Sequence, residues 1–128
     1  MYIVNADGTG LHSLNTPGLA AGDPAWSPDG SLIVFSTEPI HEWNDVGATD
    51  SPNVFEVRPD GTGLKQLTFD YGSGAPSWTS DGKILYFSQR GLWLMDADGS
   101  NEVLVPLGMD LVSSTSGYSY YADWQPTS

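Results

Sequence analysis

The chain has 128 residues, a length that suits one domain with a sizeable core. It carries 16 acidic residues against 4 basic ones, and its net charge of −12 argues against nucleic acid or an anionic membrane as a partner, because phosphates would be repelled. It has no cysteine, and no apolar run approaches the roughly 18 residues that a transmembrane helix needs.

Short alternating apolar runs between glycine- and proline-rich turns predict an all-β chain. In chain order, about eleven strands are expected, at 2–5, 11–14, 23–27, 32–36, 54–58, 64–68, 75–79, 83–88, 92–96, 102–105 and 120–125. The strand at 32–36 is apolar on both faces, which predicts burial on both.

Two long loops interrupt this pattern. The segment 37–53 holds 17 residues where the equivalent place, 89–91, holds 3, so about 14 residues are inserted there. The second long loop, 106–119, is rich in serine and glycine. Long loops in compact domains are usually functional or disordered.

Two sequence units recur at a spacing of about forty residues, which is the signature of a repeat fold. The first unit combines a tryptophan with an Asp-Gly turn and an apolar strand; it occurs at 25–30, at 77–82 and, cut short, at 123–126. The second unit places an Asp-Gly hairpin after a short strand, at 2–10, 55–63 and 93–101. We expect the chain to form one partial repeat domain, with repeat parts at 1–14, 23–68, 75–105 and 120–126 and insertions at 37–53 and 106–119.

Large apolar residues return at fixed positions of the repeat. Burial of these residues between neighbouring repeats is the expected role, because each repeat must cover the face of the next. The four columns are Trp26, Trp78 and Trp124; Tyr2, Phe55 and Trp93; Val4, Val57 and Met95; and Phe35 with Phe87.

These units resemble the TolB-like β-propeller repeat, whose consensus pairs a PAWSPDG turn with a MNADGTG turn. The resemblance is carried by 23–30 and 5–10, and the ending at 122–126 is similar to that of such chains. It implies blades of four antiparallel strands, with the first strand lining a central channel and the fourth at the rim. Members of the family are often periplasmic or exported, so the resemblance favours a periplasmic or extracellular location.

The predicted strands fill two blades and parts of a third, whereas propellers close with roughly four to eight blades. One chain is therefore not expected to close a ring. The interpretation that follows is a non-catalytic module for protein–protein association. Its partner is either a second copy, in a homo-oligomer, or a larger propeller that this chain completes.

Blade geometry would place the long loops on one face, which is the candidate ligand surface. Carboxylates, one histidine and aromatic rings there could bind a cation, a sugar or a basic peptide. The candidates are Glu38, His41, Glu42, Trp43, Asp45, Asp50, Asp70, Tyr71, Asp110 and Tyr118. The alternative function is therefore a carbohydrate- or metal-binding or lytic propeller that uses 37–53, 69–74 and 106–119.

No cofactor is expected, although binding of a calcium ion is left as an alternative. Asp96, Asp98, Asn101 and Glu102 have the alternating oxygen ligands of a calcium loop, but the full twelve-residue pattern is missing. A capped hairpin turn is the favoured explanation, because Asp7 and Asp60 hold the same repeat position. No motif of a serine hydrolase, zinc protease or phosphate-binding loop is found, so the chain is not expected to be an enzyme.

Overall fold

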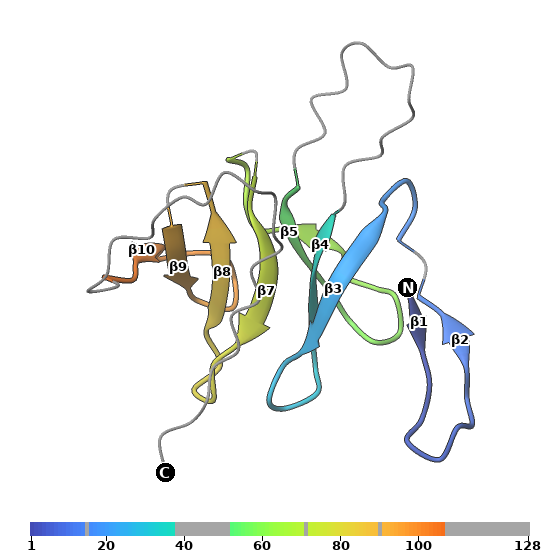
Figure 1. The fold of residues 1–128 in the computed structure, drawn as a ribbon. Helices are drawn as coiled ribbons and strands as arrows, with labels where there is room; N and C mark the ends of the chain where they lie inside the picture. Colours follow the sequence, from blue (N-terminus) through green and yellow to red (C-terminus); the bar gives the residue numbers. More distant parts are fainter. Residues whose placement is uncertain (15, 38–51, 71, 90, 107–128) are drawn as a thin grey trace, which may run out of the picture.

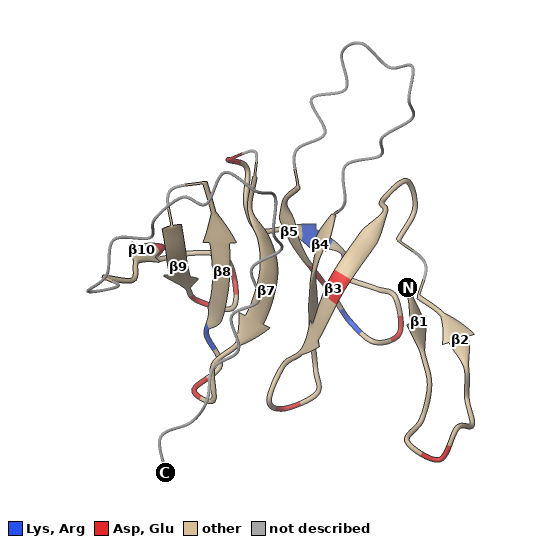
Figure 2. Ribbon diagram, viewed as in Figure 1, with Lys and Arg blue, Asp and Glu red and all other residues tan. Residues whose placement is uncertain are grey.

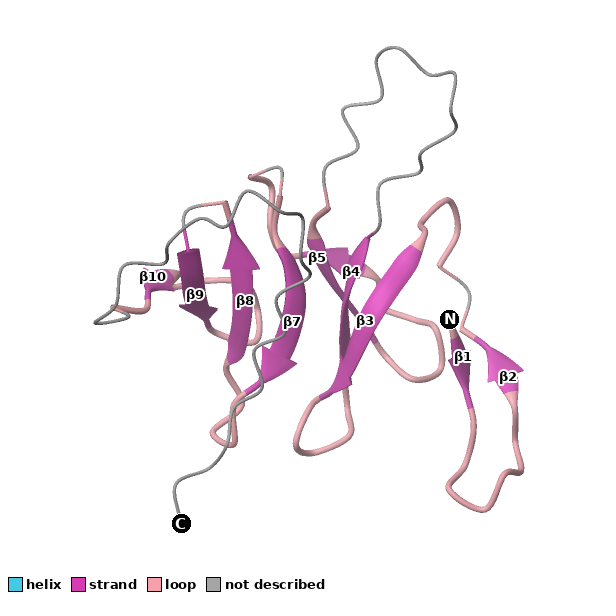
Figure 3. Cartoon of the chain, viewed as in Figure 1, coloured by secondary structure: helices cyan, strands magenta, loops and turns pink. Residues whose placement is uncertain are grey.

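The computed structural model of the chain describes residues 1–14, 16–37, 52–70, 72–89 and 91–106. Within these ranges it contains ten β-strands and no helix (Figures 1 and 3). The strands are β1 (Tyr2–Ile3), β2 (His12–Ser13), β3 (Ala21–Trp26), β4 (Ile33–Thr37), β5 (Val54–Val57), β6 (Lys65–Gln66), β7 (Gly74–Trp78), β8 (Ile84–Ser88), β9 (Gly91–Met95) and β10 (Val103–Leu104). No helix in the described ranges is long and apolar enough to cross a membrane.

The strands form three antiparallel sheets in which sequence neighbours are sheet neighbours. Strands β3 to β6 make one four-stranded blade, the first blade, and β7 to β10 make the second blade. Strands β1 and β2 form a separate N-terminal hairpin. Figure 1 shows the hairpin, the first blade and the second blade side by side in sequence order. The all-β fold with two full blades and part of a third is confirmed, and the described sheets do not close a ring. The predicted strand at 120–125 lies outside the described residues.

The strand β4 explains how the blades are held together. Its side chains alternate, so that Ile33 and Phe35 pack towards the hairpin while Val34 packs towards the second blade. All three are at most 1% exposed, which confirms the expected burial of both faces. A sheet with two apolar faces needs a layer on each side.

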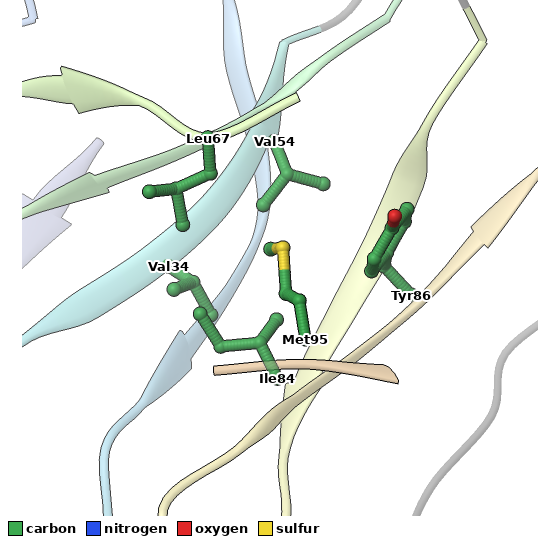
Figure 4. Packing of buried hydrophobic residues seen from close by; sticks show 6 residues of the cluster. All are labelled: Val34, Val54, Leu67, Ile84, Tyr86 and Met95. Atoms are coloured by element: carbon green, nitrogen blue, oxygen red, sulfur yellow. The ribbon is translucent and has the colours of Figure 1, made fainter. Parts of the chain in front are cut away.

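Two core clusters result from this arrangement. The hairpin core lies between the hairpin and the first blade and consists of Leu14, Ile33, Phe35 and Val57. The rings of Phe35 and Phe55 stack there with centroids 5.7 Å apart. The inter-blade core lies between the two blades and consists of Val34, Val54, Leu67, Ile84, Tyr86 and Met95 (Figure 4).

The inner strands of the two blades, β3 and β7, are built alike. Each has a register shift in the middle, between Gly22 and Ala25 in β3 and between Gly74 and Ser77 in β7. In each, the residue before the proline has a positive φ of 47°, Asp23 in β3 and Ala75 in β7. Residues other than glycine rarely adopt this conformation, so its presence at the same place in both strands marks them as equivalent copies.

One predicted column is wrong. The turn from Ser27 closes on Leu32, whereas the turn from Thr79 closes on Lys83, one residue sooner. Trp26 therefore pairs with Ile33 and Trp78 with Ile84, which makes Tyr86 the counterpart of Phe35. Phe87 instead points to the other face of its strand, because side chains alternate.

In four of the five Asp-Gly turns, the hydroxyl residue that follows the glycine donates to the aspartate; in the fifth, the hydroxyl of Thr79 donates to Asp81. In the turn between β5 and β6, Asp60 accepts hydrogen bonds from the backbone nitrogen and the hydroxyl of Thr62, at 2.9 and 2.6 Å. Asp7 with Thr9 and Asp98 with Ser100 repeat this geometry. The central glycine, such as Gly61 with φ +84°, takes a conformation that other residues avoid.

These hydrogen bonds lower the pKa of the turn carboxylates. The hydroxyl and backbone of Ser31, followed by the hydroxyl of Ser27, lower the pKa of Asp29 from 3.8 to about 2. Hydrogen bonds from the residue two positions on also lower the pKa of Asp7, Asp60 and Asp98. Because folding lowers these pKa values, their contribution to stability is complete above pH 3.8 and is lost as the pH falls towards 2.

We therefore expect the free energy of unfolding to fall as the pH is lowered from about 4 to about 2. Urea denaturation over this range measures it. Asp29→Asn removes one of the groups, so its stability should depend less steeply on pH. Parallel curves for the variant and the wild type would contradict the role given to Asp29.

The inter-blade core predicts a large effect of truncation. Ile84 is fully buried, so Ile84→Ala should cost about 2–5 kcal/mol in the free energy of unfolding. Val103, which is 54% exposed on β10, provides the control, and Val103→Ala should change stability by less than about 0.5 kcal/mol. Chemical denaturation of both variants decides the point, and equal losses would refute the assignment of the core.

Candidate protein-docking face

Each blade has two sides. We call the preceding side the one that faces the layer formed by earlier residues of the chain. In the first blade, Ile33, Phe35, Phe55 and Val57 lie on this side and pack towards the hairpin. In the second blade, Trp78, Ile84, Tyr86 and Met95 lie on it and pack towards the first blade. The preceding side of a blade is therefore the side on which the repeat places its largest apolar residues.

The inner strands show how this side is covered at the centre of the fold. Strand β7 packs against β3 and β4 of the first blade. There the indole nitrogen of Trp78 donates a hydrogen bond to the carbonyl oxygen of Ala25, over 3.2 Å. Trp78 is half-buried against the inter-blade core. A backbone carbonyl of the preceding inner strand thus satisfies the polar atom of this tryptophan.

Trp26 occupies the same repeat position but is 50% exposed. The part of the chain that the structure describes contains no inner strand on the preceding side of β3. Within the described residues, Trp26 also makes no hydrogen bond through its indole nitrogen. The expectation that Trp26 is buried in blade packing is therefore wrong for this chain by itself, because the neighbour that would cover it is not among these strands.

The hairpin also leaves apolar repeat positions exposed. Tyr2 and Val4 hold the repeat positions of Phe55 and Val57 in the first blade, and of Trp93 and Met95 in the second. Val57 and Met95 are at most 1% exposed, because a preceding layer covers them. Tyr2 is 72% and Val4 is 52% exposed. We call Tyr2, Val4 and Trp26 the open face, since all three lie on a preceding side that no described layer covers.

The other predicted packing residues divide as follows. Phe35 is buried, Phe55 and Trp93 are half-buried on preceding sides, and Phe87 is half-buried on the opposite side of the second blade. Trp124 lies outside the described residues. The indole nitrogen of Trp93 is buried without a hydrogen-bond partner in the described part of the chain.

The predicted ligand face falls almost entirely outside the described residues. Of its ten residues, the structure describes Asp70, an exposed carboxylate that accepts a hydrogen bond from the hydroxyl of Ser73. Those beyond the described ranges are Glu38, His41, Glu42, Trp43, Asp45, Asp50, Tyr71, Asp110 and Tyr118.

The calcium candidates are engaged with neighbouring groups. Asp96 forms an ion pair with Lys83 and accepts a hydrogen bond from the amide of Asn101, at 2.6 Å. Both contacts lower the pKa of Asp96, and the hydrogen bond from Asn101 has the larger effect. Asp98 caps its own turn through Ser100. The described residues contain no group of three or more His, Cys, Asp or Glu placed to hold a metal ion.

Glu102, the remaining calcium candidate, accepts a hydrogen bond from the hydroxyl of Tyr86 at 3.0 Å. Burial of Tyr86, together with this carboxylate, raises the pKa of the tyrosine. The pair thus joins β8 to the region of β10 at the rim of the second blade.

A cleft of about 480 Å³ lies between the hairpin and the turn that joins β5 to β6. Sequence reasoning missed it, because its residues come from turns of two different layers. Its polar groups are used locally: His12 contacts the carbonyl of Gly10 at 2.8 Å, and Asp60 caps its own turn. The lining residues are His12, Ser13, Leu14, Pro17, Asp60, Gly61, Thr62, Gly63 and Leu64.

Charged side chains are sparse on the inner strands and gather at the turns (Figure 2). Asp7, Asp29, Asp60, Asp81 and Asp98 all lie in turns between adjacent strands. Large apolar residues are also exposed elsewhere on the described surface, at Leu11, Leu64, Phe69, Val103 and Leu104. The open face differs from these in its place in the repeat, because a preceding layer covers the residues at equivalent positions.

Neither a family model nor a curated protein matches the sequence. Solved structures do match its fold. The putative TolB from Agrobacterium tumefaciens is similar over 80% of this chain, with 23% identity and a TM-score of 0.62. TolB from Acinetobacter baumannii is similar over 79%, with 20% identity and a TM-score of 0.58. The chain has a TolB-like β-propeller fold.

This TolB-like fold is represented here only in part. The chain spans 39% of the Agrobacterium protein and 25% of the Acinetobacter protein. The described strands thus correspond to a fraction of a propeller, in agreement with the uncovered open face.

The two equivalent tryptophans allow a direct test of this site. Trp78→Ala should cost about 3 kcal/mol in the free energy of unfolding, the lower end of the range for a buried tryptophan, because Trp78 is only half-buried. Trp26→Ala in dilute solution should cost less than about 1 kcal/mol, since its indole is half in water. Urea denaturation of both variants measures the difference, and a Trp26→Ala loss as large as that of Trp78→Ala would mean that Trp26 is already covered.

Proposed function

We propose that this chain is a non-catalytic β-propeller module that acts by associating with protein, either with copies of itself or with a larger propeller. The observation that carries this proposal is the open face. Tyr2 and Val4 are exposed at positions that are covered in both blades, and Trp26 is exposed at a position that is covered in the second blade. Apolar residues that the repeat covers elsewhere and leaves exposed here favour an interaction site.

The physical reason lies in the energy of the exposed groups. Burying apolar surface contributes roughly 25 cal/mol for each Å², so the repeat gains stability each time a preceding side is covered. Trp26 adds a polar preference, because burying an indole nitrogen costs less free energy when an acceptor is present. A blade-like protein surface supplies both the apolar cover and the backbone carbonyl.

Charge supports protein over the other classes of partner. The net charge of −12 repels nucleic acid and anionic lipid. It also opposes self-association, so apolar contacts must outweigh the repulsion between copies. Added salt screens this repulsion, since the Debye length falls from about 10 Å at 0.1 M to about 3 Å at 1 M.

We expect light scattering after size exclusion to show a discrete multiple of the 13.7 kDa chain mass, with tighter association at higher salt. Replacing Tyr2 and Val4 together by serine should weaken the association about tenfold, which corresponds to a loss of about 1.4 kcal/mol of apolar contact. Leu104→Ser, at a residue 51% exposed on β10, is the control and should leave the mass unchanged. A monomer in the wild type at all concentrations and salt levels would rule out self-association.

A further inference from the structure

Neighbouring layers meet at a seam, which we define as the place where the outer strand of one layer lies beside the Asp-Gly turn of the next. Two seams lie within the described residues. The first seam joins β2 to the turn between β5 and β6, and the second seam joins β6 to the turn between β9 and β10. Because the layers repeat one unit, the contacts of the second seam indicate which contacts the first can accommodate.

A lysine closes the second seam. The ammonium group of Lys65, on β6, donates a hydrogen bond to the backbone carbonyl oxygen of Asp98, over 2.7 Å. Hydrogen bonds from Ser100 lower the pKa of the Asp98 carboxylate most, and the charge of Lys65 lowers it further. The layers also pack tightly here, since a Cβ atom added to Gly99 would lie 3.3–3.5 Å from atoms of Leu67. One ammonium group thus binds a carbonyl oxygen beside a carboxylate.

Strand pairing matches the residues of the two seams. His12 pairs with Ile3 in the hairpin, as Lys65 pairs with Glu56 in the first blade. Ile3 and Glu56 hold the same place in the recurring unit, so His12 holds the repeat position of Lys65. An imidazole ring therefore stands at the first seam where the second seam has an ammonium group on a four-carbon stem.

The first seam is open, and the cleft of about 480 Å³ lies in it. His12 contacts its own hairpin, where its Nδ1 atom lies 2.8 Å from the carbonyl oxygen of Gly10. In the described part of the chain, no hydrogen bond joins His12 to the turn across the cleft. The turn is also more distant, since a Cβ atom added to Gly61 would be 3.9 Å from Leu14. The contact that Lys65 makes at the second seam is therefore not made by His12.

The walls of the cleft suit a lysine side chain. Asp60, the counterpart of Asp98, caps its turn through Oδ1, which accepts both hydrogen bonds from Thr62. These bonds lower the pKa of Asp60, so its carboxylate is charged at neutral pH, and its Oδ2 atom and backbone carbonyl oxygen remain as acceptors. Pro17 and Leu64 also line the cleft, and the stem of a lysine packs well on such apolar groups.

The source of the lysine is another protein. This chain has two lysines, of which Lys65 closes the second seam and Lys83 pairs with Asp96. Arg58 lies over Gly63 of the turn and is not among the residues that line the cleft. The net charge of −12 attracts a basic partner.

We propose that the cleft at the first seam binds a lysine side chain of a partner protein. The lysine ammonium group donates to the carbonyl oxygen of Asp60, as Lys65 donates to Asp98, and pairs with the Asp60 carboxylate. This inference goes beyond the proposed function, because the cleft and the open face are different surfaces. Tyr2 and Val4 lie on the opposite side of the hairpin from the cleft.

The first experiment titrates the full chain, labelled with ¹⁵N, with Nα-acetyl-lysine methylamide. The probe should shift the backbone amide resonances of Gly61, Thr62 and Gly63 in a saturable manner. Nα-acetyl-norleucine methylamide has a similar stem without the ammonium group and should bind about fivefold more weakly. This factor corresponds to about 1 kcal/mol, the energy of two unit charges about 4 Å apart in water.

The second experiment repeats the titration with variants of the two partners in the contact. Asp60→Asn removes the charge and should weaken binding of the lysine probe about fivefold, whereas Asp7→Asn, in the equivalent turn of the hairpin, should not. His12→Lys places an ammonium group where the second seam has Lys65, so it should block the probe. Val103→Lys adds the same charge at the same repeat position of β10 and should leave binding unchanged. Thermal unfolding confirms that each variant is folded.

The outcomes decide the lysine site separately from the proposed function. Equal binding of the lysine and norleucine probes would overturn the ammonium contact. Binding that Asp60→Asn and His12→Lys leave unchanged, or the absence of a saturable shift at the turn, would overturn the site itself. The double variant Tyr2→Ser with Val4→Ser should bind the lysine probe like the wild type, so association through the open face stands or falls by its own test.

Discussion

The structure depends on one constraint, which is that a blade of this sequence has two apolar faces. Strand β4 places Ile33 and Phe35 on one face and Val34 on the other, and all three are buried. No single sheet can bury both of its own faces, so each blade needs a neighbour on either side. The inter-blade core and the hairpin core are the two places where this need is met.

The same constraint gives the open face its meaning. The repeat places equivalent residues on every preceding side. The contacts of a buried residue therefore show which contacts an exposed residue at the same repeat position is expected to make. Trp78 has both apolar cover and a carbonyl acceptor, whereas Trp26 is half exposed. The proposed function follows from this difference, whereas the turn carboxylates shape the hairpins through hydrogen bonds within each of them.

Much of the fold could be predicted from the sequence, because its periodic signals are local. The Asp-Gly turns, the alternation of β4 and the recurrence of the tryptophan unit depend on neighbouring residues, and the ten described strands follow the predicted order. The counterpart of Phe35 could not be predicted, because one extra residue in the turn after Ser27 shifts the register and makes Tyr86 the match. A turn of unknown length leaves the alignment of the strands beyond it undetermined.

The sequence by itself determined the repeat, the all-β class and the excess of large apolar residues at fixed positions, since these follow from composition and spacing. Only the tertiary structure decided which copy of each position is covered. Trp26 and Trp78 hold the same position in their sequence units, yet one is half exposed and the other donates to Ala25. Burial is a property of neighbours that lie far apart along the chain, and for that reason the open face became visible only once the blades were placed beside one another.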